Sequence, residues 1–131
     1  MNALVVEIRV LEGTYSELTA RQNLLERALL ESRAALDSIK GLDGKIPEVL
    51  TQIGGGAILR SPPPSTDKVL LNVGANIVME KSKEEAVAML EERSRDVEKT
   101  IVSLAGQRSE IAQRLNADRD LLNNLMAKSQ E

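Results

Sequence analysis

The stretch IGGGAILRSPPPSTDKVLLNVGANIVMEK (residues 53–81) decides the fold, because it interrupts two long flanks that have the pattern of helices. Its four glycines, three prolines and short runs of Val, Ile and Leu disfavour a continuous helix. Gly41, Gly44 and Pro47 already end the helical pattern that precedes it. Two helices are therefore separated by a segment that favours a β-sheet.

Four short runs with strand propensity make up this central segment. They are Glu48–Ile53, Ala57–Arg60, Lys68–Val73 and Ile77–Glu80. Gly54-Gly55-Gly56 separates the first two runs and Gly74-Ala75-Asn76 the last two, which predicts two β-hairpins. The link Pro62-Pro63-Pro64-Ser65-Thr66-Asp67 between the hairpins is expected to be stiff and exposed.

The first flank repeats apolar residues with a period of 3.5, which is typical of a coiled-coil seam. Nine of these eleven seam positions are apolar: Leu4, Ile8, Leu11, Tyr15, Leu18, Gln22, Leu25, Leu29, Ser32, Leu36 and Ile39. Charged residues between them indicate a solvated outer face. The pattern predicts one long helix.

The second flank has the same period. Nine of its twelve seam positions are apolar: Val87, Leu90, Ser94, Val97, Ile101, Leu104, Arg108, Ile111, Leu115, Asp118, Leu122 and Leu125. Ser82 followed by Glu85 is a capping-box pattern, which predicts that the helix begins there.

Two such helices in one chain can pair antiparallel. We expect residue numbers across the pair to add to 126, so that Ser32 faces Ser94 and Ile39 faces Val87. Arg108 would then face Leu18 and extend outward to Glu17. A shift of one heptad is the alternative register. The polar seam residues favour a role in fixing register over a functional channel.

Composition excludes several functions. The chain has 131 residues, the size of one domain, and contains no Cys and no His, so disulfides, thiol chemistry, the usual zinc sites and His-based catalysis are not expected. A net charge of −3 gives no reason to expect nucleic acid or an anionic membrane as a partner. The absence of Cys fits a reducing compartment. No apolar run is long enough to span a membrane and the first residues lack the features of a signal peptide, so a soluble cytoplasmic protein is expected.

The two hairpins need cover for their apolar residues and partners for their strand edges, because isolated hairpins are barely stable in water. The flanks offer no globular core for them, so we expect hairpins from several chains to share strands in a barrel. Packing on the chain's own helices is the alternative. The residues expected to make assembly contacts are Val49, Ile53, Ile58, Val69, Leu71, Val73, Ile77 and Met79.

The expected fold class is therefore α+β: a long antiparallel coiled-coil hairpin with two central β-hairpins that assemble into an oligomeric β-barrel. One domain comprises an N-terminal helix (1–41), two hairpins (42–81) and a C-terminal helix (82–131). Gly54-Gly55-Gly56 lacks the Lys-Ser/Thr of a phosphate loop, and a hairpin turn is the better interpretation. The acidic residues lie mostly on solvated helix faces beside Lys and Arg, so no catalytic site, metal or cofactor is expected.

The segments EVLTQIGGGAILR, KVLLNVGAN and MEKSKEEAVAML, flanked by two long helices, resemble a prefoldin subunit of the archaeal α class. That class has two hairpins between its helices. The resemblance implies an ATP-independent chaperone, a holdase, in a hexamer of two α and four β subunits. It further implies that coiled-coil tips bind non-native polypeptides, which pass to a group II chaperonin.

Apolar residues off the seam support a binding tip. Five of nine such residues lie within the first ten or last eleven positions, and both chain ends meet at one tip in an antiparallel pair. The expected client-binding residues are Met1, Leu4, Val5, Val6, Leu121, Leu122, Leu125 and Met126. The alternative function is structural: a coiled-coil adaptor or a filament-forming prefoldin relative.

Overall fold

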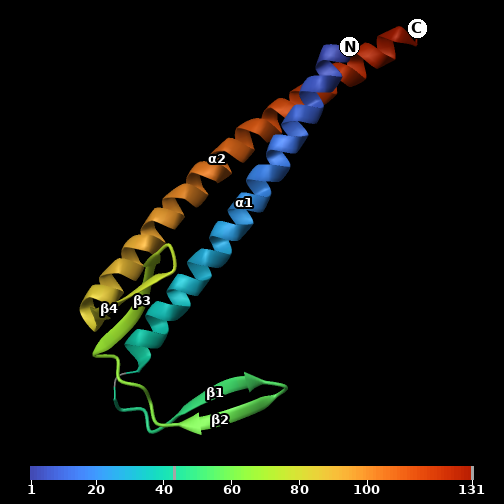
Figure 1. Ribbon diagram of the computed structural model, residues 1–131. Helices are drawn as coiled ribbons and strands as arrows, with labels where there is room; N and C mark the ends of the chain where they lie inside the picture. The colour runs from blue at the N-terminus through green and yellow to red at the C-terminus, as the bar shows by residue number, and fades with distance from the viewer. Residues whose placement is uncertain (43, 131) are drawn as a thin grey trace. The chain divides into compact units, whose positions relative to one another are not determined.

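The structure, a computed structural model, describes residues 1–42 and 44–130. The elements follow the order α1 (Asn2–Gly41), β1 (Val49–Gly54), β2 (Ala57–Ser61), β3 (Lys68–Gly74), β4 (Ile77–Ser82) and α2 (Lys83–Ser129) (Figure 1). The expected order of helix, two hairpins and helix is confirmed. The expected hairpin segment includes Asp43 and the expected second helix includes Glu131, and both residues lie outside the described residues.

The chain divides into two compact units, to which both helices contribute. The terminal unit contains Met1–Leu29 and Asp96–Glu131, and the central unit contains Leu30–Arg95. In the terminal unit α1 and α2 lie side by side and run in opposite directions, so that the start of α1 and the end of α2 share one end (Figure 1). The central unit holds the remaining parts of both helices and the four strands.

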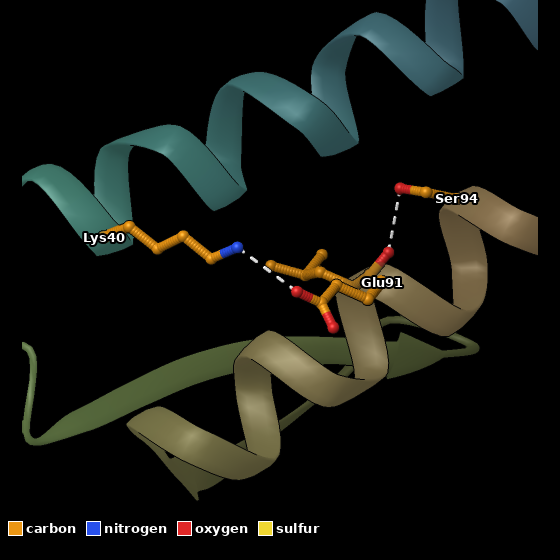
Figure 2. Close-up of polar contacts among 4 residues, drawn as sticks. Lys40, Glu91 and Ser94 are labelled. Atoms are coloured by element: carbon orange, nitrogen blue, oxygen red, sulfur yellow. Dashed lines mark hydrogen bonds and ion pairs between the residues drawn. The ribbon is translucent and has the colours of Figure 1, made fainter.

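The coiled-coil seam is where the heptad pattern predicts it. All eleven seam positions of α1 are buried or half-buried, and of the twelve on α2 only Leu125 is exposed, at 37%. In the central unit Leu36 and Leu90 share a buried cluster that also includes Ile39 and Val87. These pairs match the register in which residue numbers add to 126. Ser94 is buried, and its hydroxyl donates to the Leu90 carbonyl at 2.9 Å, so it needs no partner on α1 (Figure 2).

An ion pair between Lys40 and Glu91 joins the two helices within the central unit. Lys40 Nζ of α1 lies 3.2 Å from Glu91 Oε1 of α2 (Figure 2). Both side chains are largely exposed, at 56% and 42%, so this pair adds little stability. The burial of the seam residues is the main source of stability.

The two hairpins form separate two-stranded antiparallel sheets. Each has the same irregularity, a β-bulge one residue before the turn, between Gln52 and Gly54 in the first and between Asn72 and Gly74 in the second. Gly55 and Gly56 have φ of 59° and 76°, as both central residues of a type I′ turn require. Ala75 and Asn76 occupy the same places in the second hairpin with φ of 51° and 60°, a conformation that costs an alanine about 1 kcal/mol.

The second hairpin, β3–β4, is fixed to the helices at its base. Thr66 Oγ1 donates to the Leu42 carbonyl at 3.3 Å, and Lys83 N–H donates to the Asp67 carbonyl at 3.2 Å. The Glu85 N–H donates to Ser82 Oγ at 3.2 Å, which confirms the expected cap at the start of α2. The strand therefore leads into the helix without an intervening loop.

Candidate interaction surfaces

The β3–β4 hairpin packs against helices of its own chain. Leu71 is only 8% exposed and shares a buried cluster with Leu36 of α1 and Leu90 of α2. The expectation that the flanks offer neither hairpin any cover is therefore wrong for Leu71. This cluster joins residues of β3, α1 and α2.

That second face of α2 was not recognised in the sequence. Ala86, Met89 and Arg93 lie three and four residues apart, which places them on one side of the helix. Ala86 is fully buried, Met89 packs against the Leu36–Leu71–Leu90 cluster, and Arg93 Nη2 donates to the Asn72 carbonyl of β3 at 2.6 Å. The spacing was visible, but an Ala, a Met and an Arg do not form a conspicuous apolar stripe.

The β1–β2 hairpin has no comparable cover. Every residue from Leu50 to Arg60 is exposed, and only Val49 and Ser61 at its base are half-buried. Of the expected assembly residues, Ile53 and Ile58 lie on this open hairpin, at 61% and 54% exposure. A two-stranded sheet that is apolar and open on both faces is not stable alone in water.

The remaining expected assembly residues lie on β3–β4 and differ in exposure. Ile77 and Met79 are exposed, and Val69 and Val73 are half-buried. The hairpins also expose four large apolar residues that are not among the expected assembly residues: Leu50, Leu59, Leu70 and Val78. Adjacent apolar pairs in the sequence, such as Leu70-Leu71, indicate this exposure, because a strand that is apolar at consecutive positions has two faces to cover.

The ends of α1 and α2 in the terminal unit carry the expected client-binding residues. Met1, Val6, Leu121 and Met126 are exposed by 47–61%, and Leu125 by 37%. Leu4, Val5 and Leu122 are half-buried. Val10, exposed by 62%, belongs to the same end. It is one of the five off-seam apolar residues near the chain ends, but it is not among the expected client-binding residues. The exposed set is entirely aliphatic or methionine, which suits contact with varied apolar partners.

Polar contacts fix the pairing of the helices near this end. Arg108 donates to Gln22 Oε1 at 2.9 Å and to the Tyr15 hydroxyl at 3.1 Å, with its guanidinium 5.0 Å from the Tyr15 ring centroid. The expectation that Arg108 extends to Glu17 is therefore wrong. Tyr15 and Gln22 flank Leu18 along the seam, so Arg108 does lie opposite Leu18, but it finds partners on the seam itself.

Two ion pairs across the helices lie nearer the chain ends. Arg119 Nη2 is 3.0 Å from Glu12 Oε1, and Arg114 pairs with Glu7. An open groove of about 270 Å³ beside the first pair is lined by Tyr15, Ala112, Leu115 and Asn116 as well.

Within the described ranges no group of three or more acidic residues could hold a metal ion, and none of the helices there has the length and apolar character of a membrane span. The two hairpins and the paired helix ends carry the exposed apolar residues described above and are the candidate interaction surfaces.

A coiled coil that carries two β-hairpins defines a class of protein, and comparison with known families and relatives identifies that class. The family model for the prefoldin subunit matches residues 11–128. The prefoldin subunit alpha of Nitrosopumilus maritimus is 34% identical over 130 residues, covering 98% of this chain and 89% of that protein. The prefoldin subunit alpha of Methanoregula boonei is 36% identical over 115 residues, covering 79% and 73%.

A solved structure agrees with these sequence matches. The cryo-EM structure of filamentous PFD from Methanocaldococcus jannaschii superposes with a TM-score of 0.68 at 25% identity, covering 89% of this chain and 96% of that one. The chain belongs to the prefoldin family, and its relatives place it in the α class. It is a prefoldin chaperone subunit, which assembles with other prefoldin subunits.

Proposed function

We propose that the chain is a holdase subunit that binds non-native polypeptides without ATP at the paired ends of α1 and α2. The observation that carries this proposal is the exposure of Val6, Leu121 and Met126, by 47–58%, at the end of the terminal unit where both helices meet. Exposed aliphatic side chains gain free energy when a client's apolar surface covers them. The proposed activity involves no chemical reaction, and we propose no enzymatic function.

The proposed assembly is a hexamer of two copies of this chain with four β-class prefoldin subunits. It is supported by the open β1–β2 hairpin, whose apolar residues and strand edges need partners. In this arrangement the hairpins form a shared β-barrel and the helical pairs remain available for clients. We further propose that the complex works in the cytoplasm and transfers clients to a group II chaperonin.

Light scattering tests the holdase proposal. A chemically denatured test protein is diluted into buffer with and without the complex of this chain and a β-class prefoldin, in the absence of nucleotide. We expect near-stoichiometric complex to suppress aggregation and added ATP to have no effect. Unchanged aggregation at a several-fold excess of complex would contradict the proposal.

A structural role is the second candidate, favoured by one observation. The solved neighbour with the TM-score of 0.68 is a filamentous protein. If this chain forms filaments by itself and its complexes fail to suppress aggregation, an adaptor or filament function replaces the holdase function. Negative-stain electron microscopy of the same samples distinguishes the two.

A further inference from the structure

Asp118 is an acidic residue at a seam position of α2, within the part of the seam that leads to the end of the terminal unit. Its Oδ2 atom is buried and has no hydrogen-bond partner among the residues that the structure describes. A carboxylate oxygen that loses water without gaining a donor costs free energy. Asp118 therefore weakens the pairing of the two helices where it lies.

Two other polar seam residues of α2 recover the hydrogen bonds that burial removes. The Ser94 hydroxyl donates to a backbone carbonyl of its own helix at 2.9 Å. Arg108 Nε is also buried without a partner, but the Nη1 and Nη2 atoms of the same guanidinium donate to Gln22 and Tyr15 of α1. Arg108 thus ties α2 to α1, and Asp118 makes no comparable contact within the described residues.

Two ion pairs across the helices lie on either side of Asp118. Arg114 pairs with Glu7, and Arg119 Nη2 lies 3.0 Å from Glu12 Oε1. The arginines that flank Asp118 along α2 are thus both engaged with glutamates of α1. Neither of them neutralises the Asp118 carboxylate through an ion pair.

A buried isoleucine lies at the same level of the helix pair. Ile8 stands between the two glutamates on α1, as Asp118 stands between the two arginines on α2, so the ion pairs place these two seam residues opposite each other. Ile8 is only 8% exposed, and the neighbouring seam residues Leu4 and Leu122 are half-buried. Separation of the helices at this level would add all three side chains to the exposed apolar surface.

We propose that Asp118 is a positioning residue for client binding: it keeps the ends of α1 and α2 weakly paired, so that a client separates them and contacts Ile8. This inference rests on the proposed function and adds a seam residue to its binding surface. A client that binds the separated ends more tightly than the paired ends shifts the population toward the separated form. The weaker the pairing, the smaller the part of the binding free energy that separation consumes.

Hydrogen–deuterium exchange of the complex with a β-class prefoldin tests the first step. In D118L an apolar side chain replaces the carboxylate at the seam, and the amides of residues 2–12 and 115–128 are expected to exchange at least about tenfold more slowly than in the wild type. D118N removes the charge and keeps the size of the side chain. Its exchange rates are expected to lie between those of the wild type and D118L.

D120L is the matched control. Asp120 lies two residues further along the same helix and is exposed on its outer face. The substitution makes the same change in helix propensity, charge and apolar content without altering the seam. We expect exchange at the helix ends of D120L to stay within about twofold of the wild type.

Aggregation suppression tests the second step. The concentration of complex that halves the aggregation of a denatured test protein is expected to rise at least about threefold in D118L, although this variant has gained a leucine. The loss is smaller than the change in exchange because Val6, Leu121 and Met126 remain exposed on the paired ends. D120L is expected to suppress aggregation at least as well as the wild type. A variant that is more firmly paired yet binds clients less well is the result that a purely structural role for Asp118 does not give.

Unchanged exchange at the helix ends of D118L would overturn the proposal whatever the aggregation assay gives. Slower exchange with undiminished suppression would also overturn it, because clients would then bind the paired ends, and the holdase proposal would stand. A wild-type complex that suppresses nothing would reject the holdase proposal and with it the role of Asp118 in client binding.

Discussion

Replacing Leu71 with Asp is expected to lower the free energy of unfolding by about 4 kcal/mol or more, because the side chain is 8% exposed between Leu36 and Leu90. Truncating a buried leucine already costs about 2–5 kcal/mol, and a carboxylate adds the cost of burying a charge. The loss is a large fraction of the stability of a small domain. Urea unfolding followed by circular dichroism measures it.

Thr51→Asp is the matched control, because Thr51 lies in β1 at the position that Leu71 has in β3, three residues before the strand's final glycine, and is exposed. We expect its effect on the unfolding free energy of the chain to stay within about 0.5 kcal/mol. Assembly loss in the Leu71 variant would then follow from loss of the chain's own core. Equal stability of the two variants would show that β3–β4 does not pack on its own helices in solution.

Replacing Val6, Leu121 and Met126 together with Ser is expected to weaken client binding at least about tenfold and leave the fold and assembly intact. All three side chains are exposed, so their loss removes apolar contact area from clients without opening a cavity in the chain. The concentration of complex that halves the aggregation of a denatured test protein measures the effect.

The control for this triple variant uses aliphatic residues remote from the helix ends in sequence. Leu24, Leu30 and Val102 are exposed by 65%, 67% and 71%, more than the three residues at the helix ends. Their replacement with Ser removes a similar apolar surface and is expected to leave client binding unchanged. If both triple variants lose binding equally, capture of clients depends on total apolar surface and is not confined to the helix ends.

The coiled coil was predictable because its physics is local in sequence. A seam with a period of 3.5 requires only that apolar residues recur, and interruptions such as Ser94 can satisfy their own hydrogen bonds within the helix. The hairpin turns were predictable for a similar reason, since Gly and Asn tolerate positive φ. Ala75 was not predictable in this way, because alanine has no such tolerance, yet its φ is 51°.

The surfaces were less predictable because they depend on distances between elements. Thr51 and Leu71 have matching positions in the two hairpins, yet only Leu71 packs against the helices. The difference arises because β3–β4 is tied to Leu42 and Lys83 at its base. Arg108 bonds to Tyr15 and Gln22 because those groups lie within its reach along the seam. A strand pattern alone does not say which of two apolar faces its own chain covers.

Native mass spectrometry of this chain mixed with a β-class prefoldin subunit tests the central claim most directly, namely that the open hairpin surface is covered by other subunits. We predict one particle that contains two copies of the chain and four of its partner. A chain that remains a folded monomer of 14.3 kDa in the presence of excess partner would contradict the claim.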